Sequence, residues 1–395
     1  MQVLVLNSGS SSLKFQLFAM PEETIICAGV VERIGFTDAK FKFKSEHKNV
    51  ETETKILTHK AALKLVAKHL LDKKEGVLKT AEDIKIVGHR VVHGGMHFND
   101  TVEIDQDVKE KIKSLSSLAP LHNPANLEGI MVAETIFPTA KQVAVFDTAF
   151  LQSVPEKAYK YAIPNKLLTK HHIRMYGFHG TSHKYVSEQA NKFLNKSESK
   201  IITIHLGNGC SMTAVKDGKS IDHSMGFSPL DGLIMGTRSG SIDPSVIFHL
   251  KDNLGYSVKD INKLLNKESG MLGLTGYSDL RDIELKASEG NKDCQLALQM
   301  NTYRIKKYIG SYAAILNGLD AIVFTAGIGE NSKAIRKMVC EDLDFLGIKL
   351  DVAKNDLRSD TTRAINTDDS KVQVLVVPTN EELEIAKQSV SLFVN

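Results

Sequence analysis

Two arginines of this sequence lie among glycines, where a long charged side chain contributes little to solubility. Arg90 stands in GHRVVHGG (residues 88–95), and Arg238 stands in GTRSG (residues 236–240). A planar guanidinium donates paired hydrogen bonds to a carboxylate or a phosphate. Both arginines are therefore candidates for binding a small anion, and the alternative is that they are structural.

Three turns rich in glycine or serine directly follow apolar stretches typical of buried strands. The turns span residues 7–12, 207–211 and 327–331. Backbone N–H groups in such turns bind phosphate oxygens, and ligands of open α/β sheets bind at the carboxyl ends of the strands. A single turn of this kind is usually only a turn, but three of them after three strands indicate phosphate binding.

Four further residues could take part in phosphate chemistry, and each has a structural alternative. Lys14 alternates with apolar residues, so it either reaches a phosphate or faces solvent. Asp147 follows a strand and could be a turn residue or a helix cap. His179 is followed by a glycine and is accessible or structural, and Glu381 could simply begin the last helix.

The familiar nucleotide and hydrolase motifs are incomplete in this chain. DGKS (residues 217–220) ends like a P-loop, but Thr213 stands where its first glycine should be. The pairs Gly207/Gly209 and Gly327/Gly329 do not complete GxGxxG. SSLK (residues 11–14) matches SxxK but leads into a strand, and neither SDN nor KTG occurs. His89 and His93 lack the glutamate of a zinc-binding HExxH motif.

Strands alternating with helices must position these residues. Alternation predicts a strand, a turn and a returning strand near residue 3, and the same pattern recurs near residue 201. Amphipathic helices are expected over residues 60–74 and 296–316. The pattern predicts an α/β fold with an internal duplication of about half the chain.

Composition indicates a globular protein of two domains. The chain has 395 residues and a net charge of +3, from 50 Lys and Arg against 47 Asp and Glu, which suggests neither a nucleic acid nor a membrane as partner. Its four cysteines are scattered without a CxxC pair, so we expect reduced thiols in the cytoplasm. The first residues do not read as a signal peptide.

Motifs spread over the whole chain resemble those of the acetate kinase (acetokinase) family. They are NSGSSSLKF (7–15), HRVVHGG (89–95), APLHNP (119–124), FDTAF (146–150), YGFHGTSH (176–183), HLGNG (205–209), MGTRSG (235–240), GIGEN (327–331) and PTNEE (378–382). The family lies in the superfamily of actin, sugar kinases and heat-shock chaperone ATPases. The resemblance implies two duplicated actin-like (ribonuclease H-like) ATPase domains with an interdomain nucleotide cleft. The domains expected are residues 1–147 plus 382–395, and a nucleotide-binding domain of residues 148–381.

The resemblance also implies roles by position. The catalytic residues would be Arg90, Asp147, His179 and Arg238, with Arg90 gripping the acetate carboxylate. The acetate methyl pocket would be walled by Val92, Leu121, Phe178 and Pro229. Magnesium would be held by Asn7 and Glu381. ATP would be bound by Ser10, Ser12, Lys14, His205, Leu206, Gly207, Asn208, Gly209, Asp279, Leu280, Arg281, Gly327, Ile328, Gly329, Glu330 and Asn331.

These residue types suit phosphoryl transfer to a carboxylate. Acetate is ionised at neutral pH and needs no general base, so the task is to relieve repulsion between two anions. Arginines, a histidine and magnesium supply that positive field, and the phosphoryl group moves in line through a loose transition state. By the same reasoning Asp147 positions a metal or an arginine and is not a base towards acetate.

The sequence departs from the family pattern at three places. Leu151 stands where the family usually has histidine, and Ser241 where it usually has aspartate. The segment 278–281 is one residue short, with Leu280 in place of phenylalanine. These changes bear on positioning, turnover and adenosine contacts, but not on the reaction.

The resemblance therefore predicts a cytoplasmic ATP:acetate phosphotransferase with a carboxyl group as acceptor. It implies Mg²⁺ as the metal, with Mn²⁺ as its alternative, ATP and ADP as substrates, a homodimer, and metabolic coupling to phosphate acetyltransferase. A propionate or other short-chain acyl kinase is the main alternative, because one methylene changes specificity by only ~1–3 kcal/mol. A pyrophosphate-using variant and a non-enzymatic actin-like nucleotide switch are more distant ones.

Overall fold

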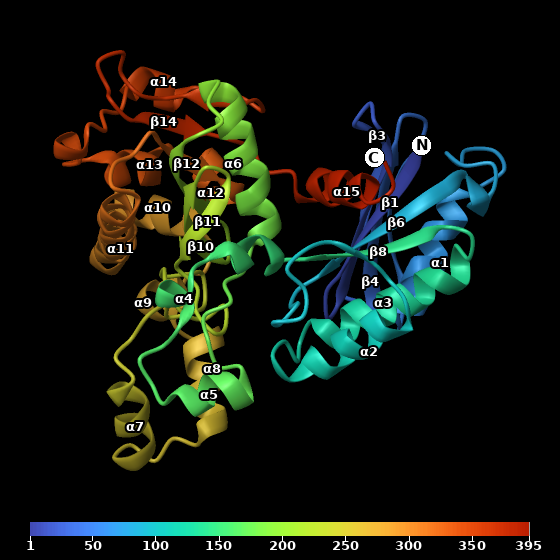
Figure 1. The fold of residues 1–395 in the computed structure, drawn as a ribbon, viewed down its shortest axis with the longest axis horizontal. Coiled ribbons are helices and arrows are strands. Elements are labelled where there is room, and N and C mark those ends of the chain that lie inside the picture. Colours follow the sequence, from blue (N-terminus) through green and yellow to red (C-terminus); the bar gives the residue numbers. More distant parts are fainter. Residues whose placement is uncertain (395) are drawn as a thin grey trace. The chain divides into compact units, whose positions relative to one another are not determined.

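The chain folds as two units in the computed structural model, which describes residues 1–394 (Figure 1). Unit 1 comprises Met1–Phe150 and the chain from Asn380 onward. Unit 2 comprises Leu151–Thr379. Each unit is built around one sheet.

The sheet of unit 1 has eight strands in the order β5-β4-β3-β2-β1-β6-β8-β7. Its first two strands form an antiparallel hairpin, while β1, β6 and β8 run parallel. The strands are β1 (Gln2–Ser8), β2 (Ser12–Ala19), β3 (Thr24–Glu32), β4 (Phe36–Ser45), β5 (Asn49–Ile56), β6 (Ile84–Val91), β7 (Val102–Glu103) and β8 (Lys141–Phe146).

Helices cover both faces of this sheet. Leu4 and Leu6 of β1 join one core cluster with side chains of α1 (His59–Leu70) and α3 (Asn123–Ile136). Val3 and Val5, which alternate with them along β1, are equally buried and face the other way. On that side lies α15 (Glu381–Ser391), which packs on β1, β6 and β8 (Figure 1). The remaining helix, α2 (Gln106–Ser114), packs on α3.

The sheet of unit 2 has six strands in the order β11-β10-β9-β12-β14-β13. They are β9 (Lys200–Leu206), β10 (Cys210–Lys216), β11 (Lys219–His223), β12 (Ala321–Thr325), β13 (Arg363–Ala364) and β14 (Gln373–Val376). Strands β11, β10 and β9 are antiparallel neighbours, and β9, β12 and β14 are parallel. The run β3-β2-β1-β6-β8 of unit 1 has the same order and directions, so the predicted duplication is confirmed.

Long helices flank the second sheet. In Figure 1, α6 (Gly180–Leu194) lies on one side of it and α11 (Lys292–Leu316) on the other. Shorter helices complete the unit: α4 (Glu156–Tyr159), α5 (Asn165–His171), α7 (Ser245–Asp252), α8 (Val258–Lys267), α9 (Gly270–Thr275), α10 (Leu280–Ser288), α12 (Ala326–Asn331), α13 (Lys333–Cys340) and α14 (Val352–Asp356).

Two predicted elements were wrong in detail. The helix expected over residues 60–74 ends at Leu70, because the side chain of Asp72 accepts the backbone N–H groups of Lys74 and Glu75 and starts a turn. Residues 327–331 do not form a glycine turn but most of helix α12, directly after β12.

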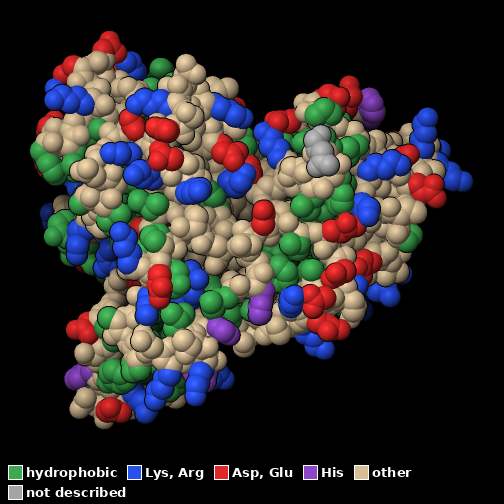
Figure 2. Space-filling view, viewed as in Figure 1, with side chains coloured by type: hydrophobic (Ala, Val, Ile, Leu, Met, Phe, Trp, Pro, Cys, Tyr) green, Lys and Arg blue, Asp and Glu red, His purple; other side chains and the backbone are tan. Residues whose placement is uncertain are grey.

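The surface carries both signs of charge. Figure 2 shows Lys and Arg side chains interspersed with Asp and Glu over both units on the face that it draws. Among the helices of residues 1–394, none combines the length and the apolar character that crossing a bilayer requires.

Candidate active site

The carboxyl ends of the parallel strands in unit 1 bring three predicted residues together. Arg90 lies near the end of β6, Asp147 directly follows β8, and Asn7 lies in β1. Arg90 donates from Nε to Asp147 Oδ1 at 3.0 Å and from Nη2 to Asp147 Oδ2, which is a two-pronged ion pair. Its Nη1 donates to Asn7 Oδ1 at 3.2 Å. The predicted anion-binding arginine is therefore held rigidly by its neighbours.

Charges gather around this pair. Burial disfavours the charge of Arg90, but the attraction of Asp147, Glu381 and Glu382 outweighs it and raises the pKa of Arg90. The pKa of Glu381 is raised to about 7, first by burial and then by Asp147 and Glu382, against Arg90 and Lys14. Unit 1 thus concentrates carboxylates beside one guanidinium.

Lys14 lies near the residues around Arg90. In the register of the β1–β2 hairpin it stands directly opposite Asn7, so the two side chains leave the same face of the sheet. Lys14 is exposed, as its alternation predicted. A mobile cation beside a fixed guanidinium suits an anion that carries several charges.

The donor set at this place fits a magnesium ion. An amide oxygen of Asn7 and a carboxylate of Glu381 are oxygen ligands, and a divalent cation would favour the charged form of Glu381. No group of three His, Cys, Asp or Glu side chains suited to a metal occurs among residues 1–394. Few protein ligands are usual for Mg²⁺, because substrate phosphates and waters supply the rest.

The serine turn between β1 and β2 is braced by residues that sequence reasoning missed. Gly9 N–H donates to Ser12 O at 2.8 Å and closes the turn. Asn126 of α3 donates to Ser8 O at 2.6 Å, and His59 Nε2 lies 2.7 Å from Gly9 O. Two residues predicted to bind ATP lie on this turn: Ser10 is exposed and Ser12 is half-buried.

The four residues predicted for a methyl pocket fall on different parts of the chain. Val92 is buried in unit 1, where its N–H donates to Asn126 Oδ1 at 3.0 Å. Leu121, also in unit 1, is 63% exposed. Phe178 is buried in unit 2, and Pro229 lies there as well. Their role in the pocket stays a prediction.

In unit 2, His179 and Arg238 converge on Gly209. A Cβ placed on Gly209 would lie 3.3 Å from Cε1 and Nε2 of His179 and 3.6 Å from Nη1 of Arg238. A side chain larger than that of glycine would press on the ring of His179 at this point. His179 has φ 60°, in the left-handed region, and such strain is common at functional sites. Its ring stacks on that of His205, with 4.3 Å between centroids.

Arg238 is held by neutral groups. Its Nη1 donates to Pro229 O at 3.0 Å and contacts Met235 Sδ at 3.6 Å, and no carboxylate among residues 1–394 pairs with it. Burial lowers its pKa, and the nearby thiol of Cys210 opposes that shift only in part. A half-buried guanidinium without an anion is prepared to receive one.

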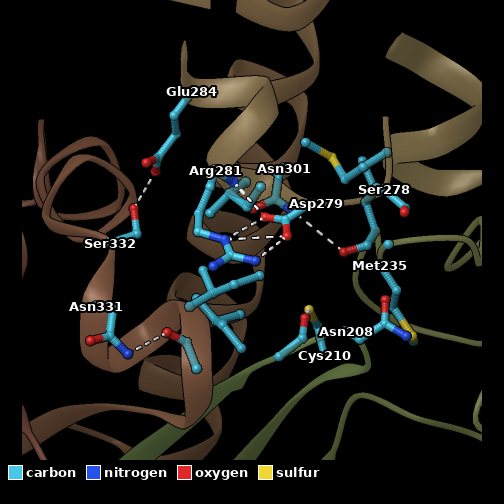
Figure 3. Close-up of a pocket in the computed structure, with 18 of the residues that line it drawn as sticks. Asn208, Cys210, Met235, Ser278, Asp279, Arg281, Glu284, Asn301, Asn331 and Ser332 are labelled. Carbon is cyan, nitrogen blue, oxygen red and sulfur yellow. Dashed lines mark hydrogen bonds and ion pairs between the residues drawn. The ribbon is translucent and has the colours of Figure 1, made fainter. Parts of the chain in front are cut away.

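A cavity of about 810 Å³ opens in unit 2 (Figure 3). Nine of the residues predicted to bind nucleotide line it: Leu206, Gly207, Asn208, Asp279, Leu280, Arg281, Gly327, Ile328 and Asn331. Its size and its mixed apolar and polar lining suit a small-molecule ligand. The other predicted residues of this unit, His205, Gly209, Gly329 and Glu330, are not among its lining residues.

The walls of the cavity are fixed by local hydrogen bonds. Asp279 caps α10 and also binds the guanidinium of Arg281, as Figure 3 shows. Arg336, which is buried, donates to the carbonyls of Gly329 and Glu330 at the end of α12. These contacts hold two of the predicted nucleotide segments in place.

Several lining residues were not predicted. Asn301 of α11 donates to Ile234 O at 3.2 Å inside the cavity, and Glu284 accepts from Ser332 at one end of it (Figure 3). Asn301 is a polar residue on the buried stripe of a long helix, and this pattern alone could have pointed to a polar cavity from the sequence. Met235, Met271 and Arg358 carry no such signal.

The departures from the family pattern have local explanations. Ser241 Oγ donates to Asp231 Oδ1 at 2.6 Å and accepts from Gly232 N–H at 3.0 Å, so an aspartate there would face another carboxylate. Leu151 is fully buried and lies where a Cβ on Gly177 would meet it. Leu280 lines the cavity.

Comparison with known proteins places the chain among close relatives. The sequence profile of the Acetokinase family matches residues 2–387. An acetate kinase of Flavobacterium johnsoniae is 63% identical over 395 residues, covering 100% of both chains. The crystal structure of Porphyromonas gingivalis acetate kinase superposes with a TM-score of 0.94 at 45% identity, covering 100% of both chains. A propionate kinase from Francisella tularensis gives a TM-score of 0.92 at 47% identity, covering 99% of both.

Proposed function

Because this chain belongs to the acetokinase family, we propose that it is an acetate kinase. It transfers the γ-phosphoryl group of ATP to acetate and gives acetyl phosphate and ADP, reversibly. The observation that carries this proposal is the match to acetate kinases over the full length of the chain, at 63% identity to one of them. The geometry then suggests how the residues perform the reaction.

Arg90 would bind the carboxylate of acetate. Of the five N–H donors of a guanidinium, three are used by Asp147 and Asn7, so two remain for an anion. Asp147 fixes the plane of the guanidinium and needs no role as a base, because acetate enters already ionised. Val92, Leu121, Phe178 and Pro229 are proposed to contact its methyl group.

Arg238 and His179 would stabilise the transferring phosphoryl group. Both lie against Gly209, and Arg238 carries a charge that no carboxylate of the described chain neutralises. Positioned donors in a poorly hydrated site stabilise the charge of a phosphoryl transition state without reorganising. The γ-phosphoryl group then moves directly, in line, from ATP to the acetate oxygen, and ADP leaves as its bond to the γ-phosphorus breaks.

The cavity of unit 2 would hold the nucleotide. It is large enough for an adenosine moiety, and a Cβ on Gly327 would meet nothing within 4 Å. This open space favours ATP over pyrophosphate as the phosphoryl donor. The serine turn with Ser10, Ser12 and Lys14 is proposed to contact the phosphates.

A magnesium ion would be held by Asn7 and Glu381, with Mn²⁺ as an alternative. When bound, it supplies positive charge to the phosphate oxygens. The side chains have the other two tasks: Arg90 would orient the carboxylate, and Arg238 and His179 would donate to the phosphoryl group.

A homodimer is part of the proposal. None of the eight residues of α7 is buried in the chain, although Val246, Ile247 and Phe248 are apolar and exposed. A second copy of this chain is the partner that we propose for this helix.

Acetyl phosphate would pass to or from phosphate acetyltransferase in the cytoplasm, where ATP is available.

Propionate is the runner-up substrate, because a propionate kinase is 47% identical to this chain. The test is a hydroxamate assay of acyl phosphate with acetate, propionate or butyrate as acceptor, and with ATP or pyrophosphate as donor. We expect the highest kcat/KM with acetate and ATP, and no product after chelation of the metal. Nucleotide-dependent polymerisation without any acyl phosphate would instead favour an actin-like switch.

A further inference from the structure

His179 and three polar side chains behind it form a chain of contacts in the interior of unit 2. His179 Nδ1 is 2.9 Å from Ser211 Oγ, and Ser211 Oγ is 2.7 Å from His183 Nε2. His183 Nδ1 is 2.7 Å from Thr203 Oγ1. Ser211, His183 and Thr203 are completely buried. We call these four residues the histidine chain.

The direction of each hydrogen bond follows from its inner end. Thr203 Oγ1 lies 3.4 Å from Thr213 O and 2.7 Å from His183 Nδ1; we assign its proton to the carbonyl, which leaves its oxygen to accept from His183 Nδ1–H. Burial, and then the charges of His223 and His205, lower the pKa of His183 well below its usual range, so this ring is neutral. Its other nitrogen, Nε2, is therefore an acceptor.

Ser211 must then donate to His183 and accept from His179. A hydroxyl has one proton, and His183 Nε2 requires it. The oxygen of Ser211 is left to accept a proton from Nδ1 of His179. The chain thus has a single consistent direction, from His179 inward to Thr213 O.

We propose that Ser211 is a positioning residue that fixes the tautomer of His179, with the proton on Nδ1 and Nε2 presented beside Gly209 and Arg238. This inference rests on the proposed function, in which His179 stabilises the phosphoryl group. With Nδ1–H committed to Ser211, Nε2 can donate to a phosphate oxygen only when the ring is an imidazolium. The active form of His179 is therefore the cation.

The charged and titratable groups around this ring belong to several elements. His205 of β9 stacks on it, and His183 of α6 lies behind it through Ser211. Arg238 Nη1 lies beside Gly209 as His179 does, and Cys210, the next residue, begins β10. A phosphate anion bound between Arg238 and His179 is the group that would favour the imidazolium.

Thr213 provides a matched control for Ser211. It lies two residues further along β10, so its side chain leaves the same face of the strand. It is equally buried, and its hydroxyl also binds a histidine, His223, at 2.8 Å. Its side chain is not part of the histidine chain.

The test compares Ser211→Ala, Ser211→Thr and Thr213→Val with the wild type. We expect Ser211→Ala to lower kcat about 10- to 100-fold, the range found when a metal-ligating histidine loses the partner that orients it. The KM values for acetate and ATP should stay within about twofold. Ser211→Thr keeps the hydroxyl and should recover most of kcat, and Thr213→Val should keep wild-type kcat.

Nitrogen NMR of protein labelled with ¹⁵N-histidine gives a readout that activity does not. The His179 signals are assigned by their loss in His179→Gln. We expect a protonated Nδ1 in the wild type and in Thr213→Val, and a shift towards the Nε2–H form or a tautomer mixture in Ser211→Ala. An unchanged Nδ1–H form in Ser211→Ala would overturn the inference, as would a loss of kcat in Thr213→Val equal to that in Ser211→Ala. Failure of the wild type to form acetyl phosphate would refute the proposed function instead and leave the tautomer assignment standing.

Discussion

The two arginines proposed to bind anions should differ sharply in what they contribute to stability. Arg90 neutralises Asp147, whose side chain is 1% exposed, whereas Arg238 is held by a carbonyl and a thioether. Arg90→Ala would leave a buried carboxylate without its cation. Arg238→Ala would remove a half-buried charge that has no acidic partner among residues 1–394.

Removing one member of a buried ion pair costs about 3–5 kcal/mol. For a domain of this size, 1 kcal/mol corresponds to about 2–4 °C in Tm, so we expect Arg90→Ala to lower the Tm of unit 1 by about 6–20 °C. Arg238→Ala loses a hydrogen bond worth about 1 kcal/mol. It also removes the desolvation penalty of the guanidinium, which offsets part of that loss. Its Tm should change by no more than about 4 °C, while kcat falls about 10³-fold or more.

Scanning calorimetry without ligands measures both variants, and the hydroxamate assay measures turnover. Arg33→Ala is the control, because Arg33 makes the same two-pronged contact with Asp38 at the surface and solvent screens that pair. Arg33→Ala should leave the Tm and turnover nearly unchanged. Arg90→Ala/Asp147→Ala should regain part of the lost Tm but no activity. An Arg238→Ala protein as unstable as Arg90→Ala would refute this reasoning.

Three further predictions concern unit 2. Gly209→Ala should lower kcat about 10-fold or more by displacing the ring of His179, whereas Gly310→Ala, where a Cβ meets nothing within 4 Å, should leave the rate unchanged. Burial raises the pKa of Asp222 to about 6, so its folded-state stabilisation is complete below about pH 4 and is lost as the pH rises through 6. Urea unfolding should therefore show the wild type losing roughly 2 kcal/mol relative to Asp222→Asn between pH 4 and pH 7, and a constant difference would contradict this. Ser241→Asp should lower the Tm by placing a second carboxylate beside Asp231, and adding Asp231→Asn should restore it.

The strands and their duplication could be predicted because local pattern determines them. Residues 3–6 and 201–206 are apolar runs followed by small residues and a returning strand, and both form the central hairpins of their sheets. Helix α12 could not be predicted, since GIGEN reads locally as a turn. What stabilises the helix lies outside the motif, in Arg336, which binds the carbonyls of Gly329 and Glu330.

The candidate site shows the same limit. Arg90, Asp147 and Asn7 carry motif signals and the sheet brings them together, whereas the bracing by His59 and Asn126 depends on packing of α1 and α3. The histidine chain also needs the strand register. Thr203 pairs with Thr213 across β9 and β10. His183 of α6 contacts both Thr203 and Ser211 and so completes the chain.

The central claim is that this chain moves a phosphoryl group from ATP onto a carboxylate, and ³¹P NMR of the reaction tests it directly. With ATP, Mg²⁺ and acetate, we expect the signals of acetyl phosphate and ADP to grow together while the γ-phosphate signal of ATP declines, and nothing to change when acetate is left out. Release of inorganic phosphate alone, at the same rate with and without acetate, would contradict the account.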